Sequence, residues 1–60
     1  MKIEEFKLNM KVSDAWFKDW GIGIVIKILK TRVYIKFPNK NKIYDMPHLI
    51  FLKQYDKGNE

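Results

Sequence analysis

Sixty residues with 12 Lys and Arg, 7 Asp and Glu and no cysteine make a chain with a formal net charge of +5. At about 100–200 residues per domain this length predicts one small domain, and with no cysteine and a single histidine (His48) the chain cannot be a disulfide scaffold or a zinc finger. An apolar content of 47%, with aromatic residues at 15%, is too high for a disordered chain.

The first residues form a lead-in to the predicted strands. Over residues 1–9 the side chains of Ile3 and Phe6 fall at helical spacing, but the segment is too short to form a helix alone. The alternative is an extended segment in which Phe6 and Leu8 cover an open end of the core. From residue 11 onward the pattern favours short strands.

A first strand is predicted over residues 11–13, followed by a loop over residues 14–19. The longest strand follows over residues 22–29, where β-branched residues dominate and proline is absent. Glycine weakens a strand interior, so Gly21 and Gly23 predict a sharp bend or the close approach of another backbone or an aromatic ring. Such a bend lets one strand curl between two sheets of a small barrel.

Residues 32–37 form the most regular predicted strand. Val33, Ile35 and Phe37 point to one face, and the polar and aromatic residues between them point to the other. This alternation is typical of a half-buried antiparallel strand. The dipeptide at positions 30–31 is the predicted turn from the preceding strand.

The remaining elements are shorter. A turn over residues 38–41, with proline and asparagine, leads to a fourth strand over residues 42–46. Pro47 then begins a short helical turn, and a last strand follows over residues 50–53. Residues 54–60 form a polar tail.

Five short, hairpin-connected strands can bury one face only by curling into a small barrel. We therefore predict an all-β, five-stranded SH3-like barrel over residues 10–53, preceded by the lead-in and followed by the tail. An OB-fold is the competitor, but it needs longer strands. The faces of residues 24–29 stay open, because a bulge would exchange them. The predicted core is apolar and consists of Val12, Val25, Ile28, Val33, Ile35, Phe37, Ile43, Met46, Leu49 and Leu52.

A family resemblance covers most of this barrel. The chain has a valine, an aromatic-Gly-x-Gly-x-Val unit, an alternating strand and closing leucines, at Val12, residues 20–25, residues 32–37, Leu49 and Leu52. This pattern resembles a Tudor-like, SH3-like bacterial domain that occurs in small proteins of unknown function. A similar domain forms the C-terminus of the superfamily-one DNA-repair helicases.

The resemblance implies binding without catalysis, with contacts to RNA polymerase and to nucleic acid in transcription or DNA repair. Two departures from the family pattern lie near the first strand. Asn9 and Met10 stand where the family has Gly-Asp, and the loop between Val12 and Trp20 is longer and lacks the family's histidine. The family's ligand surface on that loop is therefore not carried over.

Basic residues concentrate in the middle of the chain. From residue 27 to residue 42 there are six basic residues and no acidic one: Lys27, Lys30, Arg32, Lys36, Lys40 and Lys42. Tyr34 lies between Arg32 and Lys36 on one predicted strand face, which suits a single-stranded nucleic acid or an acidic protein patch. The alternative is that these residues merely keep an exposed strand soluble. These six residues and Tyr34 form the first predicted binding site.

A second predicted site is the aromatic loop, which consists of Trp16, Phe17 and Trp20. Trp20 is expected to pack across the glycines and to fill the barrel. Trp16 and Phe17 are either buried or exposed as interface anchors. A further alternative is an aromatic cage for methylated lysine, formed by Trp16, Trp20 and Tyr34 with a nearby aspartate.

These patterns predict a binding module rather than an enzyme. The chain has one serine, one threonine, one histidine and no cysteine, which leaves few nucleophiles and proton-transfer groups. We expect no metal, cofactor or small-molecule substrate. The first hypothesis is a contact with nucleic acid or RNA polymerase through the basic strand residues. The alternative is a protein–protein or regulatory module that uses the aromatic loop, as a monomer or a weak homodimer.

The chain is expected to be cytoplasmic. Its longest apolar stretch, residues 22–26, is far below the roughly 20 residues that span a bilayer. Lys2 is followed by Glu4 and Glu5 rather than by an apolar stretch, so no signal peptide is expected.

Overall fold

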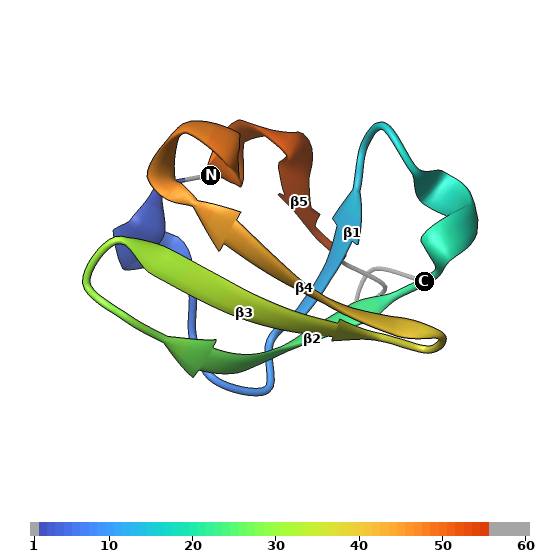
Figure 1. The fold of residues 1–60 in the computed structure, drawn as a ribbon, viewed down its shortest axis with the longest axis horizontal. Coiled ribbons are helices and arrows are strands. Elements are labelled where there is room, and N and C mark those ends of the chain that lie inside the picture. The colour runs from blue at the N-terminus through green and yellow to red at the C-terminus, as the bar shows by residue number, and fades with distance from the viewer. Residues whose placement is uncertain (1, 56–60) are drawn as a thin grey trace.

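The computed structural model describes residues 2–55 as one curled antiparallel sheet with short 3-10 helices between its strands. The strands are β1 (Lys11–Asp14), β2 (Gly23–Ile28), β3 (Arg32–Phe37), β4 (Lys40–Asp45) and β5 (Leu52–Gln54). The helices are η1 (Ile3–Glu5), η2 (Lys18–Trp20) and η3 (Met46–Phe51). The strand order is β4-β3-β2-β1-β5 (Figure 1). Helices η1 and η2 lie at opposite ends of the sheet, and η3 lies above β4 in the same view.

All the predicted strands are present, and four of them have shifted ends. The third strand has the predicted bounds, whereas β4 begins at Lys40 because Pro38 and Asn39 alone make the turn. The helical turn predicted before the last strand is η3, and β5 therefore begins at Leu52 rather than at residue 50. The predicted polar tail lies outside the described residues from residue 56 onward.

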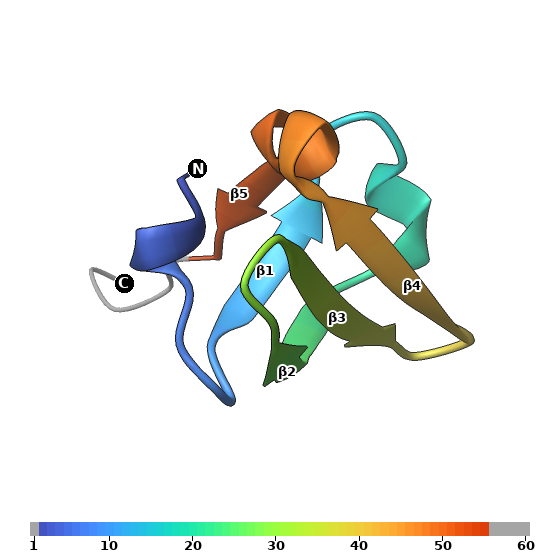
Figure 2. The same cartoon turned by 60° about the vertical axis from the view of Figure 1, so that its left-hand side comes forward.

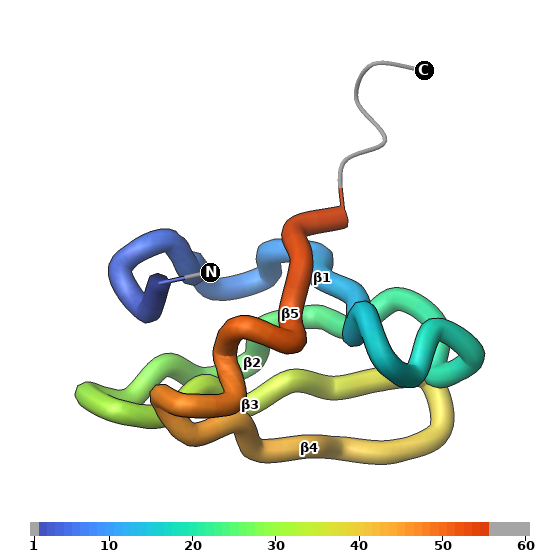
Figure 3. The backbone as a smooth tube through the Cα atoms, turned by 90° about the horizontal axis from the view of Figure 1, so that it is seen from above, coloured from blue at the N-terminus to red at the C-terminus, as the bar shows by residue number. Residues whose placement is uncertain are grey.

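The sheet curls without closing into a hydrogen-bonded barrel. Strands β4 and β5 are its two edges, and no ladder joins them in the described part of the chain. Figures 2 and 3 show the strands curling from β4 through β3 and β2 to β1 and β5. The Tyr44 hydroxyl on β4 donates a hydrogen bond of 2.7 Å to Asp14 Oδ2 on β1. A side-chain contact thus joins β4 to β1, two strands that are not neighbours in the sheet.

Strand β2 carries both of the predicted irregularities. Its register against β3 shifts between Val25 and Lys27, a bulge that leaves Val25 buried and exposes Ile26. Gly23 lies where Phe37 approaches the backbone, since a Cβ there would meet Ile35 and come within 2.8 Å of Phe37 Cε1. Of the two alternatives predicted from the glycines, the close approach of an aromatic ring is confirmed at Gly23.

The core is mostly the predicted one. Phe6 from the lead-in adds to it, whereas Leu8 is exposed and Ile28 is only partly buried. Asn9, whose N–H donates to the Val25 carbonyl at 2.8 Å, ties the lead-in to β2. The predicted core residues that are fully buried are Val12, Val25, Val33, Ile35, Phe37, Leu49 and Leu52.

The prediction of burial is wrong for two residues. Ile43 is 54% exposed and Met46 is 47% exposed, whereas Tyr44 is buried. Tyr44 pairs with inward-facing Val33, so the strand alternation turns Ile43 outward. Met46 begins η3, where the alternation of β4 no longer applies.

Candidate functional site

Part of the predicted basic site lies on the outer face of β2 and β3. Tyr34 and Lys36 share one face of β3, opposite the face that carries Ile35. Lys27 is the cross-strand partner of Tyr34, and its Nζ lies 5.8 Å from the centroid of the tyrosine ring. Arg32 lies on the same face and is paired with Asp45, with 2.9 Å between Nε and Oδ1. We call these four residues, Lys27, Arg32, Tyr34 and Lys36, the basic strand face.

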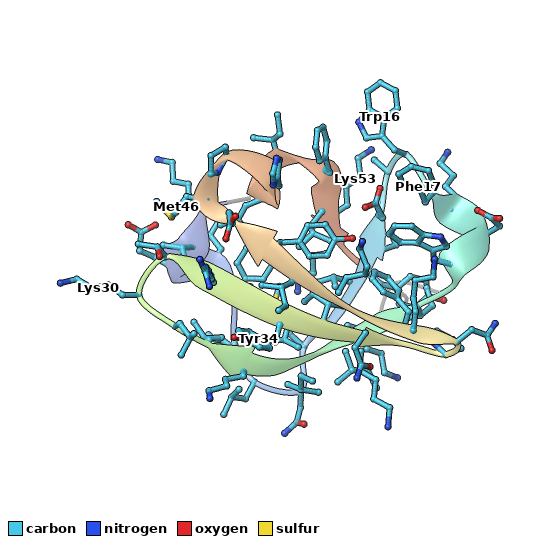
Figure 4. All side chains as sticks on the ribbon, viewed as in Figure 1. Trp16, Phe17, Lys30, Tyr34, Met46 and Lys53 are labelled. Carbon is cyan, nitrogen blue, oxygen red and sulfur yellow. The ribbon has the colours of Figure 1, made fainter. Side chains whose placement is uncertain are left out.

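The other predicted basic residues lie elsewhere. Lys40 pairs with Phe37 and Lys42 pairs with Ile35, so both lysines extend on the inner side of β4. Their Nζ atoms lie 4.3 and 5.4 Å from the centroid of the Trp20 ring. Lys30 projects from the turn between β2 and β3 (Figure 4). One predicted basic site is therefore divided between the two faces of the sheet and a turn.

A buried carboxylate shapes the aromatic loop. Asp14 Oδ1 accepts hydrogen bonds from the backbone N–H groups of Trp16 and Phe17, at 2.7 and 3.1 Å. This is the local turn that aspartate side chains favour. Its other oxygen, Oδ2, accepts the Tyr44 hydrogen bond, so both oxygens of this buried carboxylate have donors. The loop is thereby fixed to β1 and to β4.

The buried, hydrogen-bonded environment of Tyr44 changes the pKa of its hydroxyl group. Burial first, and then the hydrogen bond to the Asp14 carboxylate and its charge, raise the pKa of Tyr44 well above its ordinary value. The hydroxyl therefore remains protonated and continues to donate to Asp14 throughout the physiological pH range.

The three rings of the aromatic loop have different environments. Trp16 is 72% exposed and projects from the loop in Figure 4, with an edge contact to Phe51 at 5.9 Å between centroids. Phe17 is half exposed and stacks on Trp20, at 4.5 Å and an interplanar angle of 12°. Trp20 is partly buried and its ring makes an edge contact with Phe37, the residue that approaches Gly23.

The predicted aromatic cage is wrong. Tyr34 lies on the outer face of β3, whereas Trp20 packs against Phe37, which faces inward from the same strand. The sheet therefore separates these two rings, and Figure 4 shows Trp16 projecting far from Tyr34. Within residues 2–55, no three His, Asp or Glu side chains are grouped to hold a metal ion.

Sequence reasoning missed the Asp14–Tyr44 pair and the rings of η3. His48 and Phe51 stack at 6.0 Å between centroids, next to the Trp16–Phe51 contact. An aspartate directly before an aromatic loop is a signal for a side-chain-capped turn. The pairing with Tyr44 has no such local signal, because the two residues are 30 positions apart.

Comparison with known proteins gives no matching family model, no matching curated protein and no matching solved structure. None of the helices between residues 2 and 55 is long and apolar enough to cross a membrane.

Proposed function

We propose that the chain is a non-catalytic, SH3-like (Tudor-like) module that binds single-stranded nucleic acid through the basic strand face. The strand order, the 3-10 helix before the last strand and the glycine unit all support the SH3-like assignment. The family resemblance supports a role in transcription or DNA repair. RNA polymerase is the protein partner to which that resemblance points.

The main support for this proposal is the arrangement of residues around Tyr34. Its ring is partly exposed, with Lys27 on one neighbouring strand and Ile43 directly opposite on the other. Within residues 2–55, only Arg32 of the basic residues at positions 27–42 has an acidic partner within ion-pair distance. Unpaired lysines around an exposed ring allow a base to stack while the phosphates are neutralised.

The test is fluorescence anisotropy of labelled single-stranded oligonucleotides at low and physiological salt. We expect dissociation constants of about 1–100 µM at physiological salt, and affinity that falls steeply as salt rises. Lys36→Glu and Lys27→Glu should each reduce the salt slope by about one. Tyr34→Ala should weaken binding by about fivefold or more, as the loss of one stacked base does.

Lys53→Glu is the matched control, because Lys53 is exposed on β5, away from Tyr34 in Figure 4. Arg32→Glu is less informative, since it also removes the ion pair with Asp45. If Lys53→Glu weakens binding as much as Lys36→Glu, only net charge matters and the proposed face is wrong. Absence of binding at low salt would overturn the nucleic-acid proposal and make RNA polymerase the first partner to test.

The exposure of Trp16 favours a second candidate function, protein–protein contact through the aromatic loop. Exposed tryptophans are frequent anchors of protein interfaces. Under this candidate, Trp16→Ala abolishes partner binding or self-association, whereas Lys36→Glu leaves it unchanged. Sedimentation of both variants over a range of concentrations distinguishes a homodimer from a monomer.

A further inference from the structure

A groove of about 340 Å³ opens between the aromatic loop, β4 and η3. Phe17 and Trp20 line it from the loop, Lys42 and Tyr44 from β4, and His48 and Phe51 from η3. We call this cavity the aromatic groove. Its floor is rigid, because Tyr44 is buried and hydrogen-bonded to Asp14.

The rings of the groove are not equally available. Phe17 stacks on one face of the Trp20 indole at 4.5 Å, so Lys40, at 4.3 Å from the same centroid, covers the other face. Trp20 therefore has no free face for a ligand. The half-exposed ring of Phe17 and the partly exposed ring of Phe51 retain exposed surface, and they belong to different walls of the groove.

The groove runs beside an unpaired strand edge. Strand β4 is the last strand of the sheet on this side. In the described part of the chain, the backbone hydrogen bonds of turns and loops involve none of its residues, Lys40–Asp45. An edge with free N–H and C=O groups accepts an extended peptide as an added strand. Lysines protect such edges from self-association, and they also favour an acidic guest.

The charges of the groove favour a peptide over a nucleic acid. Asp14 and Asp45 are among its lining residues, so the groove is not uniformly cationic, as a groove that follows a phosphate backbone is. At the Trp20 end, Lys40 and Lys42 make cation–π contacts but have no ion pair with an acidic side chain among residues 2–55. An acidic side chain of a guest would meet these two lysines.

We infer that the aromatic groove binds an extended peptide, which places an apolar side chain against Phe17 and Phe51 and an acidic side chain against Lys40 and Lys42. Alternate side chains of an extended strand lie roughly 6.5 Å apart on one side. Side chains two positions apart therefore face the same side of the guest strand and can both enter the groove. This inference deepens the second candidate function and is independent of the basic strand face.

The experiment is selection of a random peptide library displayed on phage against the full chain. Enriched peptides should carry an apolar residue together with Asp or Glu. Synthetic copies are then labelled with a fluorophore and titrated with the wild-type chain, and fluorescence anisotropy measures their binding. Phe51→Ala should weaken binding by about tenfold or more, the loss typical of a hot-spot aromatic residue.

Matched variants separate the groove from its surroundings. Ile50→Ala removes an apolar side chain of η3 that is 72% exposed and does not line the groove, so it should not change binding. The Lys40→Glu/Lys42→Glu double variant should lose the acidic peptides and bind copies in which lysine replaces the acidic residue. Loss of peptide binding alone could mean that the variant is unfolded. Binding of the lysine-containing peptides by the double variant shows that it is folded and that the charge of the groove sets the preference.

Several results would overturn the inference. These are no enrichment, enrichment of peptides without the acidic residue, or equal binding by wild type and Phe51→Ala. The Lys36→Glu variant, in which the basic strand face is weakened, is used to test competition. If a single-stranded oligonucleotide displaces the peptide from this variant, nucleic acid is the occupant of the groove instead. If groove variants change only the sedimentation of the chain, the occupant is a second copy. Protein binding lost in Trp16→Ala but kept in Phe51→Ala would retain the second candidate function and reject the groove.

Discussion

At the scale of single residues, the Asp14–Tyr44 pair organises the surfaces of this protein. Asp14 is 3% exposed and accepts hydrogen bonds from two backbone N–H groups and one hydroxyl. A buried carboxylate with fewer donors would be costly, since an unsatisfied charged group loses its hydration without replacement. The same contacts hold the loop that carries Trp16 and Phe17. The position of the aromatic loop thus depends on a hydroxyl from a distant strand.

Tyr44→Phe should lower the free energy of unfolding by about 1–3 kcal/mol, because it leaves Asp14 Oδ2 without its donor. Urea denaturation followed by tryptophan fluorescence measures this change. Tyr34→Phe is the control, because that tyrosine lies on the outer face of the sheet. An equal loss in both variants would contradict the importance assigned to the pair.

The raised pKa of Tyr44 also predicts a pH dependence of stability. As pH rises above about 10, the ordinary tyrosine pKa, the unfolded chain loses this proton before the folded chain does. The folded state then binds more protons, so the free energy of unfolding falls with rising pH. Tyr44→Phe should remove this part of the alkaline loss, whereas Tyr34→Phe should retain it. The measurement is the free energy of unfolding of both variants by urea denaturation at a series of alkaline pH values.

At the scale of elements, β2 combines a bulge with a glycine at a close packing contact. The bulge at Ile26 places Lys27 on the outer face opposite Tyr34 and pairs Ile28 with inward-facing Val33. Gly23 is buried beneath Ile35 and Phe37, and Phe37 in turn contacts Trp20. The absence of a side chain at position 23 therefore allows β3 to pack closely and the aromatic loop to reach the sheet.

Gly23→Ala should destabilise the fold by about 1–3 kcal/mol, the usual cost of overpacking a core. The added Cβ would meet Ile35 and lie 2.8 Å from Phe37 Cε1, so one of these side chains must move. Ile24→Ala, on the exposed face of the same strand, should cost much less. Thermal unfolding of both variants tests the difference, and equal melting temperatures would show that the packing around Gly23 is loose.

At the scale of the whole molecule, stability depends on a short lead-in. A domain of 60 residues has a total stability of roughly 3–9 kcal/mol, so each fully buried aromatic residue matters. Phe6 belongs to the core although it precedes the first strand. It belongs to the core of a sheet in which, among residues 2–55, no ladder joins β4 to β5.

Phe6→Ala should cost about 3–5 kcal/mol and leave much of the protein unfolded at room temperature. Leu8→Ala is the matched control from the same segment, because Leu8 is 61% exposed. Far-ultraviolet circular dichroism and urea titration of the two variants provide the measurement. A folded Phe6→Ala protein of near wild-type stability would show that the lead-in is dispensable.

The sequence by itself determined the number of strands, the bounds of β3, the close approach at Gly23 and most of the core. These features follow from alternation, turn residues and glycine, which act over a few neighbouring positions. Only the tertiary structure decided that Tyr44 rather than Ile43 faces inward, because a one-residue change of register exchanges the two faces of a strand. The same register divided the predicted basic residues, placing Lys27 and Lys36 on the outer face and Lys40 and Lys42 beside Trp20. The aromatic groove likewise arises from segments far apart in the chain, which meet only when the sheet curls.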